Sequence, residues 1–323
     1  MKQHDLSALS ATFDELANTH VDRIPGVWVA HSGKPGPVVG ITIMTHGNEP
    51  CGLGVYQYFR QQCWLERRLR KGSVYVVLNN LEAARQYFEI AKAGGDMDTK
   101  LGKRFIKVNM NRLPADVYSL EDDERSEVRR AQELRPIWDR FDHALDIHSM
   151  AQAGAPPMIV ALGRSDLEMV LDFPIQKIIT RIDAVQRGKP ATYFYGKGKV
   201  PVYGIEAGSH EEERSFTLAR ICAILFLQSL GIIDREIPSR PVSHTEYRIF
   251  GSVWFPDESY ELTREIPNFG DVKRGEVLAT GNGDPIIAQQ DEVALMGPRG
   301  TKPPSIGEEV LFLAHEVEHP VRK

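Results

Sequence analysis

The pattern His-x-x-Glu occurs three times in this chain, beginning at His46, His210 and His315. An imidazole and a carboxylate three residues apart are typical of two ligands for one zinc ion. Only the first copy follows an apolar, strand-like run, VVGITIMT (38–45), and a Gly-Asn pair then favours a turn. The sequence therefore predicts that His46 and Glu49 lie at the carboxyl end of a strand, where open α/β sheets bind their ligands.

A catalytic zinc ion needs a third protein ligand and keeps its fourth position for water. His148 is the best candidate because it closes a second apolar run, ALDIHS (144–149). Asp146 stands two residues earlier, so in a strand its side chain points to the same face. We therefore expect Asp146 to hold the His148 ring by a hydrogen bond. For each histidine taken alone, the alternative is a residue at a strand end that is hydrogen-bonded within the protein and binds no metal.

Apolar runs and helix-like segments alternate along most of the chain. The runs that predict strands are 26–33, 37–46, 73–80, 144–149, 157–163, 177–182 and 201–208. The segments with helical periodicity are 47–64, 81–93, 121–141 and 215–231, and Pro136 is expected to kink or divide the third. The alternation predicts an α/β fold whose mixed, mostly parallel sheet is flanked by helices on both faces.

The character of the sequence changes after about Pro238. Short strand-like runs with frequent Gly and Pro follow, and no helical pattern is convincing. At 323 residues the chain is long enough for about two domains. We therefore predict a catalytic α/β domain over residues 1–237 and a C-terminal all-β domain over residues 238–323, packed over the mouth of the site.

Composition excludes several classes of protein. With 39 Lys and Arg against 44 Asp and Glu the formal net charge is −5, and no dense basic patch suits a nucleic acid. No apolar run is long enough to span a membrane, and the N-terminus is polar where a signal peptide is apolar. Three scattered cysteines are typical of reduced thiols. We expect a cytoplasmic protein; its oligomeric state is left open, a homo-oligomer included.

Four ordered segments resemble one known family. They are THGNEPCG (45–52), RFIKVNMNR (104–112), LDIHS (145–149) and GIEAG (204–208). In this order they are similar to the succinylglutamate desuccinylase/aspartoacylase family, a zinc carboxypeptidase-like group of amidohydrolases. Runs in the C-terminal region, such as FGDVKRGEVLAT (269–280), also resemble the β domain of that family. The resemblance implies a zinc-carboxypeptidase-like fold and hydrolysis of an N-acyl amino acid, a small molecule, to a carboxylate and a free amino acid.

The resemblance also implies roles for individual residues. One Zn²⁺ per chain would be bound by His46, Glu49 and His148. Glu206 would be the general base that takes a proton from the attacking water and returns it to the leaving amine. Arg104 would polarise the scissile carbonyl, and Asn111 with Arg112 would bind a carboxylate of the substrate.

Departures from the family pattern concern the substrate. Asn109 stands where the family usually has aspartate, so a supporting carboxylate is missing. Gln152 stands where desuccinylases tend to carry a basic residue. Lys197 or Lys199 would have to supply the cation that a succinyl group needs, although a solvated loop is the simpler interpretation for both. We therefore predict that a neutral or smaller acyl group such as acetyl is cleaved at least as well as succinyl.

Two other functions stay open at this point. One is a metallopeptidase of the same chemistry acting on a peptide C-terminus, and the other is a zinc-binding protein without turnover. Of the remaining histidines, His210 with the glutamates at 211–213 is expected to be an exposed cluster at a helix entry. His315 and His319 are expected to belong to a frayed C-terminal tail.

Overall fold

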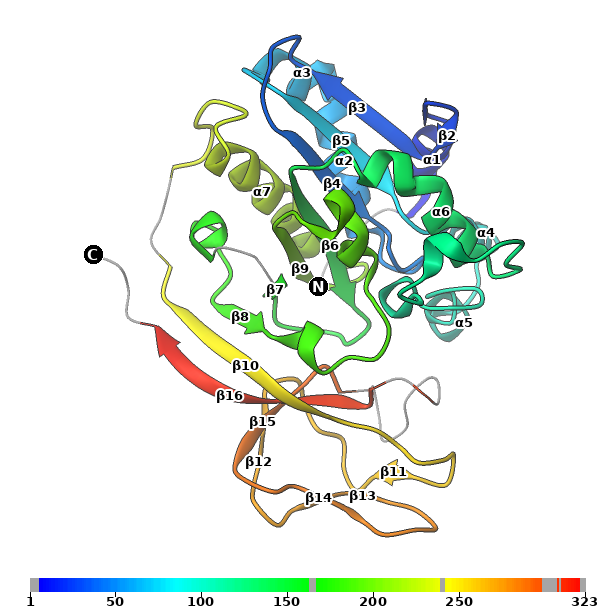
Figure 1. Cartoon of the computed structure of the whole chain (residues 1–323), viewed down its shortest axis with the longest axis vertical. Helices are drawn as coiled ribbons and strands as arrows, with labels where there is room; N and C mark the ends of the chain where they lie inside the picture. The colour runs from blue at the N-terminus through cyan, green and yellow to red at the C-terminus, as the bar shows by residue number, and fades with distance from the viewer. Residues whose placement is uncertain (1–5, 163–166, 239–241, 298–306, 308, 320–323) are drawn as a thin grey trace.

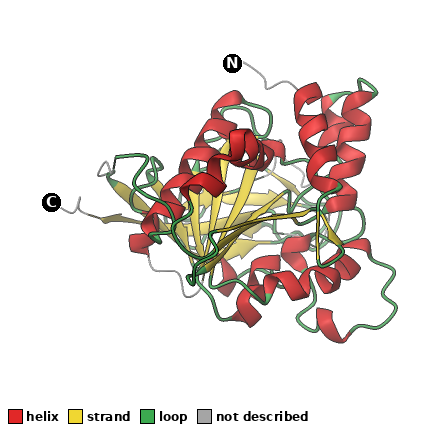
Figure 2. Cartoon of the chain, turned by 90° about the horizontal axis from the view of Figure 1, so that it is seen from above, coloured by secondary structure: helices red, strands yellow, loops and turns green. Residues whose placement is uncertain are grey.

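The protein is built on one large mixed sheet with helices on both sides, as Figures 1 and 2 show. The computed structural model describes residues 6–162, 167–238, 242–297, 307 and 309–319. Within these residues the order of the eleven strands in the sheet is β12-β15-β16-β10-β8-β7-β9-β6-β4-β5-β3. A three-stranded sheet, β11-β13-β14, and a two-stranded one, β1-β2, lie beside it.

The α-helices of the described residues are α1 (Leu6–Ala17), α2 (Leu53–Arg60), α3 (Trp64–Arg68), α4 (Leu81–Lys92), α5 (Met97–Leu101), α6 (Ser126–Trp138) and α7 (Glu213–Ser229). None of them is long and apolar enough to cross a membrane. Among the short 3₁₀ helices, η1 (Pro50–Gly52), η3 (Met110–Arg112) and η7 (Ala191–Gly198) contain or adjoin residues that the sequence predicts for the site.

The strands are β1 (His20–Val21), β2 (Ile24–Pro25), β3 (Val27–His31), β4 (Val38–Ile43), β5 (Ser73–Leu78), β6 (His143–Met150), β7 (Met158–Leu162), β8 (Lys177–Thr180), β9 (Val202–Ser209), β10 (His244–Val253), β11 (Glu261–Leu262), β12 (Gly270–Val272), β13 (Val277–Thr280), β14 (Ile286–Ile287), β15 (Glu292–Leu295) and β16 (Leu311–His319). Every strand predicted in the α/β part is present, with small differences at its ends.

The centre of the sheet is parallel, because β5, β4, β6 and β9 run side by side in the same direction. Alternate residues of these strands enter two different cores. Val74 and Val76 of β5 pack with α1, α2, α4 and α7, whereas Tyr75 and Val77 pack with α6 and η7. Burial on both faces explains the continuous apolar runs in the sequence. The parallel order of β4, β6 and β9 also brings their carboxyl ends together at one edge of the sheet.

The C-terminal strands extend this sheet instead of standing apart from it. β10 pairs with β8 in parallel, and β16, β15 and β12 continue the sheet in antiparallel order. Figure 1 shows β10 and β16 crossing below the α/β part. No helix follows α7 within the described residues, as the sequence predicted. The small sheet has its own apolar core, which includes Leu278 and Leu311. A domain boundary at 237/238 stays a prediction, because hydrogen bonds of one sheet join the two parts.

Three expectations from the sequence are wrong. The expected division at Pro136 is absent, because α6 continues past it to Trp138; a kink at this position stays a prediction. His315 and His319 belong to β16, which pairs along β10, and not to a frayed tail. His210 is buried and not exposed, with 6% of its surface accessible.

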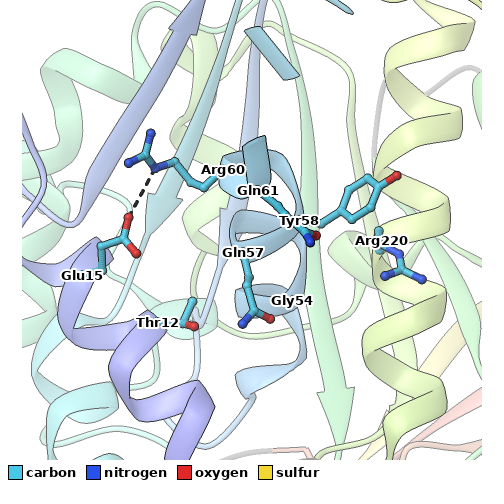
Figure 3. A pocket seen from close by; sticks show the side chains of 8 residues that line it. All are labelled: Thr12, Glu15, Gly54, Gln57, Tyr58, Arg60, Gln61 and Arg220. Atoms are coloured by element: carbon cyan, nitrogen blue, oxygen red, sulfur yellow. Dashed lines mark hydrogen bonds and ion pairs between the residues drawn. The ribbon is translucent and has the colours of Figure 1, made fainter. Parts of the chain in front are cut away.

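A surface hollow of about 600 Å³ lies between α1, α2 and α7, as Figure 3 shows. Both of its cations are already engaged by the chain. Arg60 donates a hydrogen bond to Glu15, and the guanidinium of Arg220 lies 4.9 Å from the ring centre of Tyr58. The residues that line the hollow therefore offer no unengaged cation to a ligand.

Candidate metal centre

The turn after β4 places His46 and Glu49 below the protein surface. Gly47 in this turn has no room for a side chain, because a Cβ atom there would lie 2.3 Å from the carbonyl carbon of Ala83. The Glu49 N–H donates to the His46 carbonyl oxygen at 3.2 Å, and Pro50 then begins η1. His46 and Glu49 are 2% and 1% exposed, so the turn buries both side chains.

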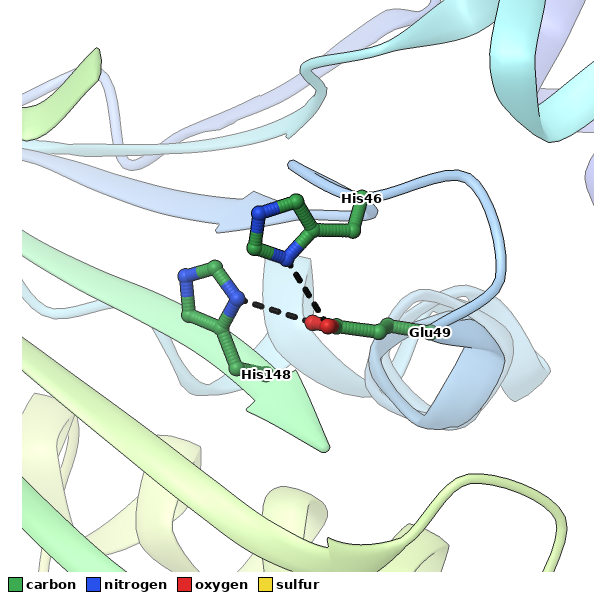
Figure 4. A group of neighbouring side chains, drawn as sticks. All are labelled: His46, Glu49 and His148. Atoms are coloured by element: carbon green, nitrogen blue, oxygen red, sulfur yellow. Dashed lines mark hydrogen bonds and ion pairs between the residues drawn. The ribbon is translucent and has the colours of Figure 1, made fainter. Parts of the chain in front are cut away.

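His148 meets these two residues from the end of β6, as Figure 4 shows. The Nδ1 atom of His46 lies 2.8 Å from Glu49 Oε1, and the Nδ1 atom of His148 lies 2.8 Å from Glu49 Oε2. One ligand atom from each of the three residues lies within 4.8 Å of the others. The structure therefore brings together the three side chains that the sequence predicted as metal ligands.

The partners of His46 decide which of its ring nitrogens carries a proton. Its Nε2 atom lies 2.9 Å from Asn109 Oδ1, and the backbone N–H of Asn111 donates to the same Oδ1 at 2.8 Å. A backbone N–H can only donate, so this atom of Asn109 is the oxygen and Nε2 of His46 donates to it. In the neutral ring Nδ1 then has a free lone pair that faces an oxygen of Glu49. Two acceptors at this distance need a proton or a metal cation between them, and burial together with Arg104 disfavours the protonated ring.

Asp146 orients the His148 ring as Asn109 orients the His46 ring. This contact confirms the hydrogen bond that the sequence predicted. The Nε2–H of His148 donates to Asp146 Oδ2 at 2.7 Å, so Nδ1 is again turned towards Glu49. The hydroxyl groups of Thr42 and Thr45 donate to the other oxygen, Oδ1, at 2.7 and 3.0 Å. Asp146 is therefore fixed on both sides, and it fixes the ring in turn.

The charged groups of the cluster shift one another's pKa values. Burial alone would raise the pKa of Glu49, but His46 and His148 lower this pKa well below its usual value. Burial lowers the pKa of His46, and Arg104 lowers it further. Burial also disfavours charge on His148, yet Asp146 and Glu49 raise its pKa well above the usual value. Two imidazole nitrogens and one carboxylate are a set of donors that fits a zinc ion.

Glu206 lies next to this group on β9, where it pairs in register with His148 of β6. The residue as a whole is half-buried, but its Oε2 atom is fully enclosed and has no partner among the described residues. Burial, together with the charge of Glu49, raises the pKa of Glu206 to about 8. A carboxyl group with a pKa near neutrality is suited to accept and return a proton.

Arg104 also reaches the cluster. Its Nη1 donates to Glu49 Oε1 at 3.0 Å, and about 36% of its side chain is exposed. The Gly47 N–H donates to the Arg104 carbonyl oxygen at 2.9 Å, which ties the Arg104 segment to the turn after β4. Arg104 therefore presents a partly solvated cation beside Glu49.

Arg112 is engaged differently from what the resemblance implies. Its Nε and Nη2 donate to Glu309 Oε2 at 2.9 and 2.6 Å, and the Glu309 side chain is fully buried. The Arg187 N–H donates to the second oxygen of Glu309 at 2.8 Å, and the Arg187 guanidinium lies 3.7 Å from the Trp254 ring centre. We call Arg112, Arg187, Trp254 and Glu309 the Arg112 junction, because they join the α/β part to the C-terminal strands.

Asn111 lies between the metal centre and this junction. Its side-chain oxygen is buried and has no partner among the described residues. The predicted roles of Asn111 and Arg112 in substrate binding stay predictions. No pattern in the sequence indicated that a carboxylate of the chain itself would face Arg112, since Glu309 is 197 residues away.

His210 is a neighbour of the site that the sequence reasoning missed. Its Nδ1 lies 2.9 Å from the hydroxyl oxygen of Ser149, the residue after His148. Burial lowers the pKa of His210 to about 4. The charge of Glu49 acts against this shift, and the charge of Arg104 adds to it. The adjacent Glu211 accepts hydrogen bonds from Lys100 and Tyr87, both at 2.8 Å. Two signals in the sequence could have found it: its His-x-x-Glu pattern and its position four residues after Glu206.

Comparisons with known proteins bear on the fold. No protein-family model matches the sequence, and the search of curated proteins finds no match. Solved structures do match. Succinylglutamate desuccinylase from Vibrio parahaemolyticus aligns with a TM-score of 0.63 and 14% identity, over 91% of this chain and 87% of its own. This chain has the fold of the succinylglutamate desuccinylase/aspartoacylase structures.

Two further structures agree with this finding. Murine aminoacylase 3 aligns with a TM-score of 0.59 and 18% identity, over 90% of this chain and 99% of its own. A product-bound structure of the ectoine utilization protein EutE from Ruegeria pomeroyi aligns with a TM-score of 0.57 and 19% identity, over 90% of this chain and 88% of its own. The resemblance noted in the sequence is thereby confirmed as a resemblance of fold.

Proposed function

We propose that this protein is a zinc-dependent amidohydrolase that cleaves an N-acyl amino acid to a carboxylate and a free amino acid. The observation that carries the proposal is the convergence of His46 Nδ1, His148 Nδ1 and the Glu49 carboxylate, while both Nε2 atoms are held by other acceptors. Without a cation between them, at least one buried lone pair would face another, which is costly. The fold shared with a desuccinylase and an aminoacylase supports this proposal.

In this proposal each residue of the chain has a defined task. A zinc ion bound by His46, Glu49 and His148 would polarise the substrate carbonyl and make a water molecule more acidic. Glu206 accepts the proton of the attacking water and returns it to the nitrogen of the leaving amine. Its enclosed Oε2 atom and a pKa raised to about 8 suit both steps.

Arg104 stabilises the developing oxyanion in this proposal. A partly exposed guanidinium beside Glu49 can turn one N–H towards the substrate while another holds the carboxylate. Asn111 lies near the same segment and would contact the amino-acid half of the substrate. Asp146 and Asn109 do not touch the substrate; they keep both Nδ1 atoms directed at the metal.

Release of free amino acid tests the proposal directly. The zinc-loaded protein is incubated with a panel of N-acetyl and N-succinyl amino acids and with short peptides, and amine release is measured. We expect turnover of N-acyl amino acids, its loss after the metal is removed with a chelator, and its return when zinc is added. Turnover of peptides alone would favour a metallopeptidase. No amine release from any member would contradict the proposed function.

A further inference from the structure

The two histidines of the metal centre are held by partners of different charge. His148 donates its Nε2–H to the carboxylate of Asp146 at 2.7 Å. His46 donates its Nε2–H to the neutral amide oxygen of Asn109 at 2.9 Å. A carboxylate partner makes an imidazole a more basic metal ligand, and a neutral amide does so much less.

Further contacts increase this difference. Arg104 donates to Glu49 Oε1, the oxygen that faces His46, and so places a positive charge on that side of the centre. The oxygen that faces His148, Oε2, accepts the uncharged backbone N–H of Ser149 at 3.3 Å. The half of the centre around His46 therefore contains a cation and a neutral amide, and the half around His148 contains an additional anion. A metal cation is attracted more strongly to the second half.

We infer that the metal is held unequally, with His148 as the strong ligand and His46 as the weak one, and that Asn109 is the positioning residue that sets the difference. This inference rests on the proposed metal centre and deepens it. Asn109 keeps the His46 ring in the correct orientation but adds no charge. It lowers the metal affinity below the value that the same geometry would give with a carboxylate at this position.

Asn109→Asp tests the inference without removing a contact to His46. Aspartate can accept both hydrogen bonds that Asn109 Oδ1 accepts, from His46 and from the Asn111 N–H at the start of η3. The substitution therefore changes the charge and keeps the acceptor geometry. The thermal unfolding of the metal-free variants shows whether each one is folded.

Zinc affinity is measured by competition with a chromophoric chelator, so the assay needs no substrate. We expect Asn109→Asp to bind zinc roughly 10-fold more tightly than the wild type, and Asp146→Asn to bind roughly 10- to 100-fold more weakly. Asn111→Asp is the matched control, because it adds the same charge two residues away without touching an imidazole. It should change the affinity much less than Asn109→Asp.

A second readout is the visible spectrum of the cobalt-loaded protein. The ligand-field bands should shift in Asn109→Asp and stay in place in Asn111→Asp, because only the first changes the basicity of a ligand. Equal affinities of Asn109→Asp and the wild type, or equal effects of the two Asp variants, would overturn the inference, as would the absence of metal binding. Tighter zinc binding without amine release would uphold the inference and contradict only the proposed function.

Discussion

The metal centre and the Arg112 junction are both buried and charged, but they are assembled in different ways. The proposed ligands of the metal centre come from the turn after β4 and from the end of β6, its parallel neighbour. The Arg112 junction joins η3, the loop before η7 and the segment before β16, which lie far apart in the sequence. In the first, the Nδ1 atoms of both histidines face the carboxylate of Glu49. In the second, Arg112 and Glu309 satisfy each other.

This difference separates a binding site from a contact that holds parts of the fold together. Glu206 keeps an unpaired, buried oxygen beside the charge of Glu49, and such an atom raises the energy unless a ligand binds. Glu309 is fully buried, and Arg112 and the Arg187 N–H satisfy it. A substrate carboxylate at Arg112 would have to compete with Glu309.

The largest expected effect concerns the metal ligands. His46→Ala or His148→Ala should abolish stoichiometric zinc binding, because two remaining ligands hold zinc poorly. Elemental analysis of the purified variants measures this. His315→Ala, at an exposed histidine of β16, is the control and should keep about one zinc per chain. Full metal content in either ligand variant would show that the trio is not the metal centre.

Glu206→Gln should keep the metal and lose turnover. The substitution preserves shape and removes the group that moves the proton, so kcat should fall roughly 10²- to 10⁴-fold. Metal content measured on the same preparation separates this effect from a loss of zinc. A kcat close to that of the wild type would remove Glu206 from the mechanism.

Removal of Arg112 from the Arg112 junction should lower the free energy of unfolding. Arg112→Ala leaves the carboxylate of Glu309 buried without its cation, which costs about 3 to 5 kcal/mol in the free energy of unfolding. Urea denaturation measures this value, and Arg112→Ala/Glu309→Ala should recover part of it. If Arg112→Ala raised KM and left the unfolding free energy unchanged, Arg112 would bind substrate and the junction would be unimportant for stability.

Arg104→Ala is the matched comparison. Arg104 is partly exposed, so its removal from the zinc-loaded protein should change stability little. We expect kcat to fall by roughly 10²- to 10³-fold, as is typical when an oxyanion donor is lost. Similar losses of stability in the two arginine variants would erase the distinction between the two regions.

The smallest expected effect concerns the acyl group. Lys197 and Lys199 are both exposed on the η7 segment, so neither is buried at the site to neutralise a succinyl carboxylate. An N-acetyl amino acid should therefore be cleaved with a kcat/KM at least equal to that of the N-succinyl form of the same amino acid. A strong preference for succinyl would show that a cation near the site is still unidentified.

Patterns in the sequence were enough to predict the trio His46, Glu49 and His148 and the central sheet. Apolar runs that are buried on both faces identify parallel strands, and His46, Glu49 and His148 stand at or just after the ends of two such strands. Parallel neighbours bring their carboxyl ends to one edge of a sheet, so local patterns were enough. The predicted hydrogen bond from His148 to Asp146 was also local, because it joins residues two apart on one strand.

Partners that come from distant parts of the chain could be found only in the folded structure. Asn109 meets His46 across 63 residues, Glu309 meets Arg112 across 197, and β10 joins β8 through a parallel pairing that no turn signals. His210 is buried because it follows β9, which pairs with β6 and so places the His210 ring against Ser149. Local periodicity reports which face of an element is apolar; it carries no information on which distant polar group will lie opposite. Folding of the whole chain selects those pairs, because buried polar groups must find partners wherever the packing of the elements places them.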